Sequence, residues 1–432
     1  MKFILKKIIS IIIKFEAILI IKKYKPEIIA VTGSIGKTST KDAIFAVMSD
    51  SFFVRKSEKS FNSEIGVPLT ILGCQNAWFN PIEWARNIIT GLELIIFDQD
   101  YPKWLIIEVG ADRPGDIRAI AKWLKPSIVV LTSFAKVPVH VEFFKNRDEI
   151  IREKKYLVDA LKHDGILIVN SDDIDSMKIK ESTKNISFIY GTDKLADIVA
   201  TEAKNYYGKD GHIEGITFKV EYEKNIIPIV IKGSLGAKSI YSPLAAITLG
   251  LTQKINIVKA AESLLNLEVS RGRMRILKGI KKTTIIDDTY NSSPAALTSA
   301  LYSLKHVNIN KGGRKIAVLG DMMELGKHSA EEHYKTGKVV AEVCDILVTV
   351  GIRSRKMAEG AQDALMSEKN IFQFEDSLSA GKWLQDIMRQ DDVILVKGSQ
   401  SVRMERVVEE VMLEPEKAKE LLVRQEEEWL NI

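Results

Sequence analysis

The chain has 432 residues, which is too long for one compact core and predicts two or three domains. Hydrophobic residues make up 46% and charged residues 28%, as in an ordinary globular protein, and the net charge is only +5. This mild, interleaved charge argues against nucleic acid as a partner. The two cysteines, Cys74 and Cys344, form no metal or redox motif, so we expect core thiols in a reducing cytoplasm.

The N-terminal residues 1–25 fit neither a signal peptide nor a transmembrane helix. Lys6, Lys7, Lys14 and Glu16 interrupt their apolar run, whereas a membrane span needs about 20 predominantly apolar residues. The pattern predicts a basic amphipathic helix. Two interpretations stay open: the helix contacts a membrane surface, or it packs on its own domain.

From residue 27 onward, short β-branched runs alternate with helical stretches, a pattern typical of an α/β fold with a mostly parallel sheet. An alternating stretch at 215–233 predicts an antiparallel hairpin, and a second α/β series follows it. We therefore expect a central P-loop-type ATPase domain and a C-terminal Rossmann-like α/β domain, with an N-terminal helix before them. The expected boundaries are 1–26, 27–269 and 270–432. The expected strands are 28–33, 104–110, 127–133, 165–173, 283–291, 315–321, 346–351 and 392–399.

A strand, a glycine turn and a helix follow one another in IIAVTGSIGKTSTKDAI. Gly33 and Gly36 permit a tight turn, and the helix N-terminus offers a phosphate its free N–H groups and its positive dipole end. Lys37 is placed to neutralise phosphate charge, and the Thr38 hydroxyl to ligate Mg²⁺. The loop has a short G-x-x-G-K-T form, because Val31 stands where the longer GxxxxGK[ST] pattern has its first glycine. It predicts a nucleotide-binding loop.

Polar residues after later strands extend this site. Glu108 ends a predicted strand, where a carboxylate can hold Mg²⁺ beside a triphosphate, although an acid facing a loop explains it equally well. His140 and Glu142 follow another strand, and His140 is a candidate for a second metal site, with a structural histidine as the alternative. Lys154 lies on the following helix and is a candidate to point back towards this edge, with a solvated lysine as the alternative that composition does not disfavour.

The second α/β series also has polar strand ends. One cluster predicts either a binding edge or a solvated turn. The stretches 320–326 and 396–407 follow two further strands, and three polar strand ends on one sheet suggest a second substrate site. The charged tail 414–432 predicts a solvated helix. The cluster consists of Arg273, Asp287, Asp288, Tyr290 and Asn291, and the candidate substrate residues of the two stretches are Asp321, Glu324, Lys397 and Ser399.

Nine motifs occur in order along the chain: TGSIGKTSTKD, FNSEIGVPLT, EVGADRPGDI, HVE, VNSDD, GRMRI, DDTYNSSPAAL, VLGDMMELG and VKGSQSVRMERV. Over about residues 27–410 they resemble the Mur ligase family, and within it the members that add D-alanyl-D-alanine to a UDP-N-acetylmuramoyl-tripeptide. The resemblance implies an ADP-forming amide ligase of peptidoglycan synthesis that uses ATP and Mg²⁺. The peptide carboxylate attacks the γ-phosphate to form an acyl phosphate, which the dipeptide amine then attacks. Positioning and charge neutralisation supply the catalysis.

The resemblance also implies a role for each candidate residue. A carbamate on a lysine turns a cation into a carboxylate-like metal ligand, which gives Lys154 a purpose. Asn62 and Ser63 are implied to line the peptide substrate. The implied catalytic residues are Lys37, Lys154 and His140. The implied metal ligands are Thr38, Glu108, His140 and carbamylated Lys154. The implied nucleotide contacts are Gly33, Ser34, Gly36, Lys37, Thr38, Ser39, Arg273, Asp288 and Asn291.

The chain departs from those family members at its start, where residues 1–26 stand in place of a UDP-binding domain. A segment with Trp78, Trp84 and residues 87–104 offers a substitute surface and, with the basic N-terminus, favours a lipid-linked or membrane-proximal acceptor. We expect a cytoplasmic monomer, at the inner face of the membrane if its N-terminus contacts lipid. Two alternatives remain: a Mur-like ligase of another carboxylate, and a nucleotide-binding scaffold without catalysis.

Overall fold

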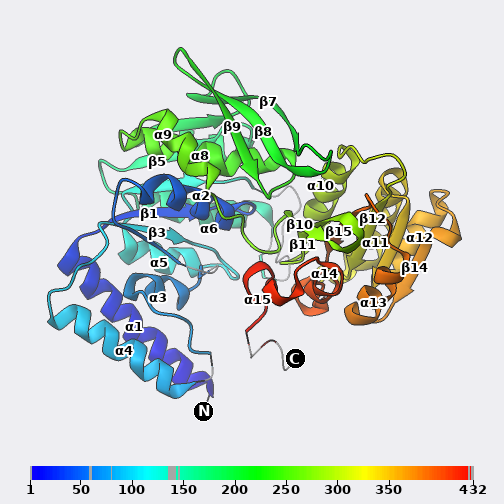
Figure 1. Ribbon diagram of the computed structural model, residues 1–432. Helices are drawn as coiled ribbons and strands as arrows, with labels where there is room; N and C mark the ends of the chain where they lie inside the picture. The colour runs from blue at the N-terminus through cyan, green and yellow to red at the C-terminus, as the bar shows by residue number, and fades with distance from the viewer. Residues whose placement is uncertain are drawn as a thin grey trace. The chain divides into compact units, whose positions relative to one another are not determined.

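The chain folds into two compact units, each built from helices and a β-sheet (Figure 1). This computed structural model describes residues 2–57, 61–78, 80–134, 143–144, 146–426 and 429. The predicted α/β class with mostly parallel sheets is confirmed, while the predicted domain boundaries stay a prediction. The first unit comprises Met1–Thr201, Lys219–Ile229 and Ile240–Leu267, and the second Glu202–Phe218, Val230–Ser239 and Glu268–Ile432.

The first unit alternates strands and helices along most of its length, and strands β7 to β9 contribute residues to both units. Its elements are α1 (Lys2–Tyr24), β1 (Glu27–Thr32), α2 (Lys37–Ser49), β2 (Val54–Lys56), α3 (Gly66–Leu72), α4 (Pro81–Ile96), β3 (Trp104–Glu108), α5 (Asp116–Leu124), β4 (Ile128–Leu131), α6 (Arg147–Asp159), β5 (Ile166–Asn170), α7 (Ile174–Glu181), β6 (Ile186–Gly191), β7 (Ile198–Tyr207), β8 (Ile213–Tyr222), β9 (Asn225–Lys232), α8 (Tyr241–Thr252) and α9 (Ile257–Leu265).

The nine strands form one sheet in the order β2-β3-β1-β4-β5-β6-β7-β8-β9. The strands from β2 to β7 pair in parallel. Only two residues join β8 to β9, and neighbouring strands joined so tightly must be antiparallel, which confirms the predicted hairpin. In the parallel part Val31 lies opposite Glu108. Because β1 and β3 run in the same direction, the phosphate loop after β1 and Glu108 lie at one edge of the sheet.

One face of this sheet is covered by α1, α3, α4 and α5. Alternate residues of β1 and β3, such as Ile28 and Ala30, share a continuous apolar core with those helices. On α1 the core side consists of Ile9, Ile13, Ala17 and Ile20. The interpretation of the N-terminal helix as one that packs on its own domain is therefore confirmed.

The ends of α1 and α4 are joined by polar contacts. The Lys23 ammonium donates to the carbonyl oxygens of Leu94 and Phe97, 3.1 and 2.7 Å away, and the Tyr24 hydroxyl donates to Leu94 at 2.9 Å. These bonds satisfy carbonyls that the last turn of a helix leaves unpaired. Within the described residues, no helix combines the length and the apolar character needed to cross a bilayer.

Glu16 is buried between α1 and α4. Its side chain is 2% exposed, and neither carboxyl oxygen has a hydrogen-bond partner among the described residues. A Cβ on Gly91 would lie only 2.3 Å from its Oε2, so the glycine allows α4 to approach this side chain. Burial raises the pKa of Glu16 from 4.5 to about 7, because the apolar surroundings disfavour the charged form.

We expect the replacement Glu16→Gln to stabilise the protein at pH 8 by about 1–3 kcal/mol and to have a much smaller effect at pH 5. A raised folded-state pKa means that the native protein binds this proton more tightly than the unfolded chain. Stability is therefore lost as the pH rises from 4.5 through 7, and the glutamine removes that loss. Urea unfolding at the two pH values measures the difference, with exposed Glu93→Gln as the control. An equal effect at both pH values would contradict the prediction.

The second unit has a six-stranded sheet in the order β10-β11-β15-β12-β13-β14. Only β10 is antiparallel to its neighbour, and the other pairs are parallel. Its elements are β10 (Arg275–Gly279), β11 (Thr283–Asp288), α10 (Pro294–Lys305), β12 (Lys315–Gly320), α11 (Ser329–Val343), β13 (Ile346–Val350), α12 (Arg355–Asp363), β14 (Ile371–Phe374), α13 (Ser377–Ile387), β15 (Val393–Lys397), α14 (Glu405–Val411) and α15 (Ala418–Leu421).

The prediction of a solvated, charged helix over the tail is wrong. The tail forms one 3-10 turn and the four-residue α15, after which Leu422 is extended and Arg424 has a left-handed φ of 56°. Leu422 is fully buried and Arg424 is 7% exposed. Tertiary contacts decide this outcome. Burying Leu422 and pairing Arg424 in the core stabilises the chain more than a short isolated helix would.

Candidate active site

The phosphate loop follows β1 as predicted. Gly36 has a φ of 84°, a left-handed conformation that favours glycine, and α2 begins at the next residue. Gly33 passes so close to β4 that a Cβ would lie 1.9 Å from the Thr132 hydroxyl. The amides of Ser34 and Ile35 donate to the carbonyl of Ser133, at 2.9 and 3.1 Å. These contacts fix the loop, and Lys37, Thr38 and Ser39 form the first turn of α2, where the positive end of the helix dipole favours an anion.

Three predicted side chains meet at the end of β3. The Thr38 hydroxyl donates to Glu108 Oε2 at 2.8 Å, and the Asn62 amide donates to Glu108 Oε1 at 3.2 Å. Glu108 is only 1% exposed, so it is not an acid on an exposed loop. The structure therefore brings Asn62, expected near the peptide substrate, to the same carboxylate as the phosphate loop.

The oxygens of Thr38 and Glu108 fit a magnesium ion. Adjacent ligands of an octahedral Mg²⁺ at about 2.0–2.1 Å lie about 2.9 Å apart, close to the observed 2.8 Å. Within the described residues no group of three His, Cys, Asp or Glu side chains could hold a metal. His140 and Glu142 lie outside the described residues, so the role of His140 stays a prediction. A magnesium held by one hydroxyl and one carboxylate, with phosphate oxygens and water, is the usual arrangement beside a nucleotide.

Lys154 lies on α6 and is 5% exposed, so its interpretation as a solvated lysine is wrong. Burial, together with the positive charge of Lys37, lowers the pKa of this amine to about 7, although Glu153 and Glu108 oppose the shift. The lowered pKa increases the fraction of neutral amine near neutral pH. A neutral amine is the form that attacks CO₂, so the environment of Lys154 suits a carbamate.

Glu153 fixes the helix that carries Lys154, and sequence reasoning missed it. Its carboxylate accepts hydrogen bonds from the amides of Gly115 and Arg118, at 2.9 and 3.0 Å. Both amides lie at the start of α5, where a carboxylate is stabilised by the helix dipole. No spacing in the sequence marks Glu153, because its partners are more than thirty residues away. Ser63 likewise has a local contact: its hydroxyl accepts from the Gly66 amide at 3.3 Å, at the start of α3.

The second unit gathers its own polar cluster at the ends of β11 and β15. Lys397 is 2% exposed and lies 2.7 Å from Asp288, its opposite residue in the parallel register. It also donates to the carbonyl of Asn291 at 2.8 Å. The Arg273 guanidinium lies 4.0 Å from the centre of the Tyr290 ring. Asp287 is fully buried, and Arg273, Asp288 and Tyr290 are half-buried, so this part of the cluster is packed, while Asn291 is exposed.

Burial raises the pKa of both acids in this cluster. The pKa of Asp287 rises to about 6, and its carboxylate accepts hydrogen bonds from the amides of Gly272 and Thr289. Burial also raises the pKa of Asp288, although the ammonium of Lys397 counteracts the rise. Acids with raised pKa values near a paired lysine are common at functional sites.

The third predicted strand end lies beside this cluster. The Ser399 amide donates to the Asp321 carbonyl at 3.0 Å, and the Ser399 hydroxyl accepts from the Met323 amide at 2.9 Å. The Asp321 carboxylate accepts from the Ser354 amide at 2.7 Å. Glu324 has a φ of 62°, an unusual conformation for a non-glycine residue. The order β11-β15-β12 explains why these residues meet: β15 lies between the other two strands.

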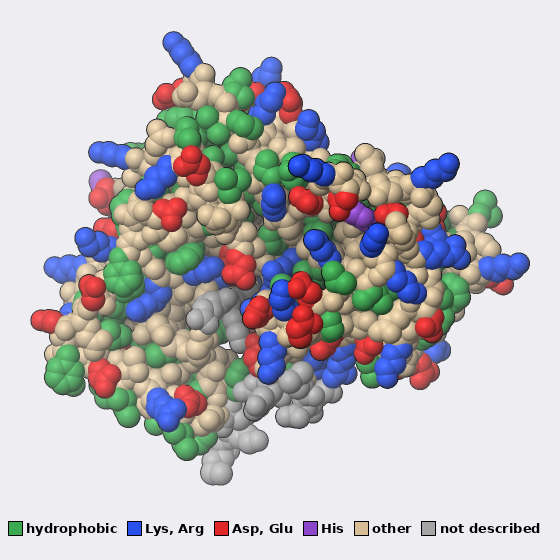
Figure 2. Space-filling view, in the orientation of Figure 1, with side chains coloured by type: hydrophobic (Ala, Val, Ile, Leu, Met, Phe, Trp, Pro, Cys, Tyr) green, Lys and Arg blue, Asp and Glu red, His purple; other side chains and the backbone are tan. Residues whose placement is uncertain are grey.

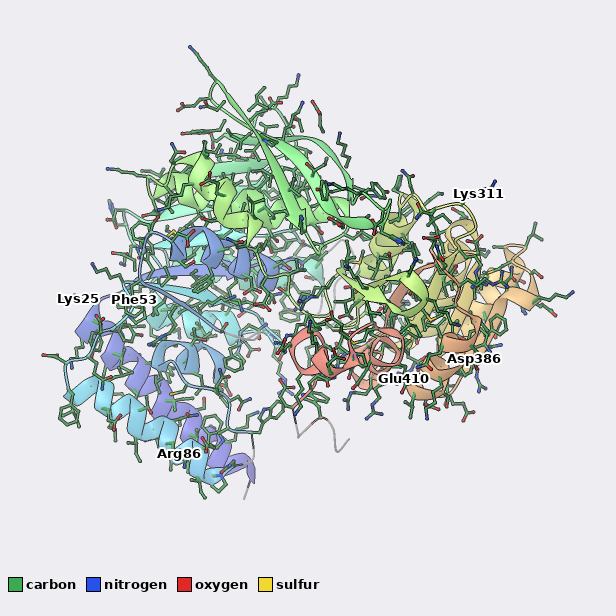
Figure 3. The ribbon with its side chains drawn as sticks, in the orientation of Figure 1. Lys25, Phe53, Arg86, Lys311, Asp386 and Glu410 are labelled. Atoms are coloured by element: carbon green, nitrogen blue, oxygen red, sulfur yellow. The ribbon has the colours of Figure 1, made fainter. Side chains whose placement is uncertain are left out.

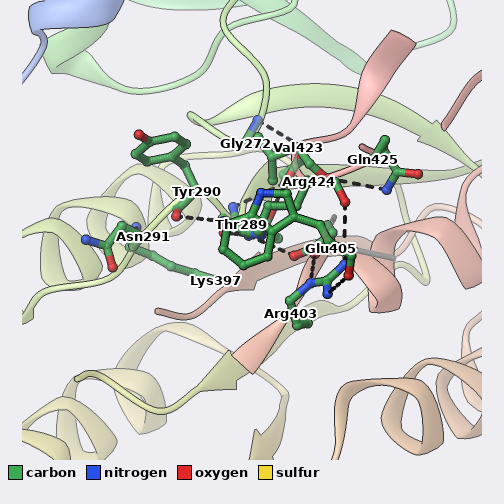
Figure 4. Close-up of polar contacts among 12 residues, drawn as sticks. Gly272, Thr289, Tyr290, Asn291, Lys397, Arg403, Glu405, Val423, Arg424 and Gln425 are labelled. Carbon is green, nitrogen blue, oxygen red and sulfur yellow. Dashed lines mark hydrogen bonds and ion pairs between the residues drawn. The ribbon is translucent and has the colours of Figure 1, made fainter. Parts of the chain in front are cut away.

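A buried ionic network supports the edge of the sheet at the ends of β11 and β15, and sequence reasoning missed it. Glu405 is fully buried and pairs with Arg403 and, at 2.7 Å, with Arg424. Arg424 also donates to the carbonyls of Thr289 and Tyr290, directly after Asp288 (Figure 4). The tail thereby holds the loop that carries Asn291. A charged tail looks solvated in sequence, because its partners are about 20 and 135 residues away.

Two family models match most of the chain. The Mur ligase middle domain matches residues 31–250, and the Mur ligase glutamate ligase domain matches residues 272–400. The chain belongs to the Mur ligase family. The predicted resemblance is therefore confirmed, and the matched regions contain the phosphate loop, Glu108, Lys154 and the second polar cluster.

Individual relatives agree with this membership. The chain is 26% identical over 392 residues to the UDP-N-acetylmuramoyl-tripeptide--D-alanyl-D-alanine ligase of Bacillus subtilis, covering 90% of this chain and 76% of that protein. It is 28% identical over 405 residues to the enzyme of that name from Mycobacterium leprae, covering 87% and 71%. The MurF ligase of Thermotoga maritima in complex with ADP has the same fold, with a TM-score of 0.74, 24% identity, and coverage of 95% and 84%.

Proposed function

We propose that this protein is an ADP-forming ligase that adds D-alanyl-D-alanine to a UDP-N-acetylmuramoyl-tripeptide-type acceptor in peptidoglycan synthesis. The contact of Thr38 and Asn62 with buried Glu108 carries the proposal, because it joins the phosphate loop to a residue of the motif expected to line the peptide. The names of the relatives supply the substrates.

The proposed reaction has two steps. A carboxylate oxygen of the peptide attacks the γ-phosphorus of ATP, and the bond to the leaving ADP breaks. The dipeptide amine then attacks the acyl carbonyl, inorganic phosphate leaves, and the amine proton passes to solvent. Lys37 and the first turn of α2 bind the phosphates in this proposal, and Asn62 and Ser63 orient the peptide. Arg273, Asp288 and Asn291 are proposed nucleotide contacts, and Asp321, Glu324, Lys397 and Ser399 proposed substrate contacts.

A magnesium ion would neutralise phosphate charge in this site. Thr38 and Glu108 would hold it, together with His140 and a carbamate on Lys154. Burial and the positive charge of Lys37 disfavour a protonated Lys154. The neutral amine that results can react with CO₂, and this is the physical reason for proposing a carbamate on Lys154.

The decisive experiment measures phosphate release with ATP, Mg²⁺, D-alanyl-D-alanine and the UDP-linked tripeptide, omitting each component in turn. Release that requires both organic substrates, with an amide product of the expected mass, supports the proposal. Parallel assays in CO₂-depleted and bicarbonate-containing buffer test Lys154, and activity that bicarbonate does not change would argue against the carbamate.

Two other outcomes would replace the proposal. Amine-dependent ADP release with a different acceptor would indicate a Mur-type ligase of another carboxylate. ATP binding without release under any combination would indicate the nucleotide-binding scaffold. Sedimentation of the active protein would test the proposed monomer, and localisation in cells the proposed cytoplasmic site at the inner face of the membrane.

A further inference from the structure

Helix α1 is apolar on two sides, but only one of them is covered. The side with Ile9, Ile13 and Ala17 lies in the core. On the opposite side Ile11 is 60% exposed and Phe15 61%, and Ile8 and Ile12 are exposed as well. A soluble amphipathic helix normally buries its apolar stripe and exposes polar residues, so this second apolar side lacks the cover that its composition calls for.

The neighbouring helix α4 continues this exposed side. Its residues Ile82, Ile89, Leu92 and Ile96 are exposed and recur at the spacing of one helical face, and Phe97 follows them. Helices α1 and α4 pack against each other (Figure 1). We call the exposed residues the hairpin face: Ile8, Ile11, Ile12, Phe15, Ile82, Ile89, Leu92, Ile96 and Phe97. Figure 2 shows green hydrophobic side chains at the surface of this region.

Basic side chains border the hairpin face. Residues 1–25 contain seven lysines and a single acid, the buried Glu16. Lys7 and Lys14 share one side of α1, because seven residues correspond to about two helical turns, and Lys25 directly follows the helix. Figure 3 shows Lys25 at the end of α1 and Arg86 on α4. On α4, Glu83 pairs with Arg86, and Glu93 is an exposed acid within the face.

We propose that the hairpin face docks on the surface of an anionic phospholipid bilayer. Its apolar side chains would enter the interface between headgroups and acyl chains, and its lysines would contact the phosphates, as in other helices that lie in a membrane surface. The proposal is independent of the proposed ligase activity, because docking needs neither nucleotide nor substrate.

The charge of α1 favours this partner over a second copy of the chain. Two copies meeting through α1 would bring two rows of lysines together, and like charges repel at the separations found in an interface. An anionic bilayer offers the opposite charge together with an apolar layer. One partner would then match both the lysines and the apolar side chains of the hairpin face.

The test is co-sedimentation of the full chain with vesicles of phosphatidylglycerol and phosphatidylcholine, compared with vesicles of phosphatidylcholine alone. We expect binding to the anionic vesicles, and weakening in 0.5 M salt because salt screens the lysines. The double variant Ile11→Ser/Phe15→Ser and the variant Lys14→Glu should each bind about tenfold more weakly. These side chains lie at the surface of α1, so thermal unfolding and ATP binding should stay near wild type.

Matched variants elsewhere on the surface distinguish docking through the hairpin face from non-specific binding to vesicles. Leu195 is 88% exposed and Leu365 93%, and Lys311 is an exposed lysine labelled in Figure 3. The variants Leu195→Ser/Leu365→Ser and Lys311→Glu should bind vesicles like wild type. Equal loss in these controls would overturn the assignment to the hairpin face.

Two further results would overturn the proposal itself. One is the absence of sedimentation with anionic vesicles at low salt. The other is a dimer in analytical ultracentrifugation that Ile11→Ser/Phe15→Ser dissociates while vesicle binding stays absent, since the hairpin face would then bind a second copy.

Discussion

Replacing Lys37 with alanine is expected to lower kcat for ATP-dependent ligation about 10²- to 10³-fold. Lys37 opens α2 directly after the left-handed Gly36, so its ammonium belongs to the phosphate loop. In the proposed reaction negative charge moves onto the β-phosphate as ADP leaves, and a fixed cation stabilises that charge more than it stabilises bound ATP. Coupled detection of ADP release measures the loss.

Two control variants accompany Lys37→Ala: one keeps the charge at position 37, and the other removes a lysine at a different position. Lys37→Arg keeps the charge but changes its geometry, and should recover only part of the activity. Lys122→Ala removes an exposed lysine of α5 in the same unit and should leave activity unchanged. If Lys37→Ala folds normally and keeps wild-type kcat, the lysine of the phosphate loop does not stabilise the developing charge as proposed.

The second large effect concerns Glu405. Replacing it with alanine should lower the free energy of unfolding of the second unit by about 3–5 kcal/mol. The substitution leaves the guanidinium groups of Arg403 and Arg424 buried without their carboxylate, and an arginine cannot escape the cost by losing its proton. Urea unfolding at neutral pH measures the change.

Two variants delimit the interpretation of this loss. Glu405→Gln keeps the shape and one acceptor oxygen and should cost less than alanine. Glu416→Ala removes an exposed acid of the same tail and should have little effect. A loss in Glu405→Ala no larger than in Glu416→Ala would show that the two arginines are satisfied by the backbone carbonyls alone.

Several strands escaped prediction for a physical reason. Strand β2 reads V-R-K and so shows no apolar run that would mark a buried central strand. Strand β6 does carry β-branched and aromatic residues, in I-S-F-I-Y-G, and was nevertheless not predicted. They are strands because neighbours in the sheet pair with them. The central strands β1, β3, β4 and β5 were predictable, because both of their faces are buried and their β-branched runs are nearly continuous.

The residues of the candidate site also divide into those that the local sequence predicts and those that it does not. The phosphate loop and Glu108 were predictable, because a loop's glycines and a strand's last residue are local features. The family motifs implied a role for Lys154, but its burial was not predictable, since the local sequence shows an ordinary helix with charges on most sides. Burial and the charge of Lys37 lower the pKa of its amine to about 7. The Asn62 contact with Glu108 and the Glu153 contact with α5 also join distant segments.

The sequence by itself determined the α/β class, the nucleotide loop, the family and the basic character of α1. Each of these follows from residues close together in the chain or from motifs in a fixed order. Only the tertiary structure decided which face of α1 is covered, that Glu16 and Lys154 are buried, and that the charged tail is anchored by Arg424. Burial and pairing depend on groups brought together from distant segments. They determine the free-energy cost of a charged side chain in the folded protein far more than its neighbours in the chain do.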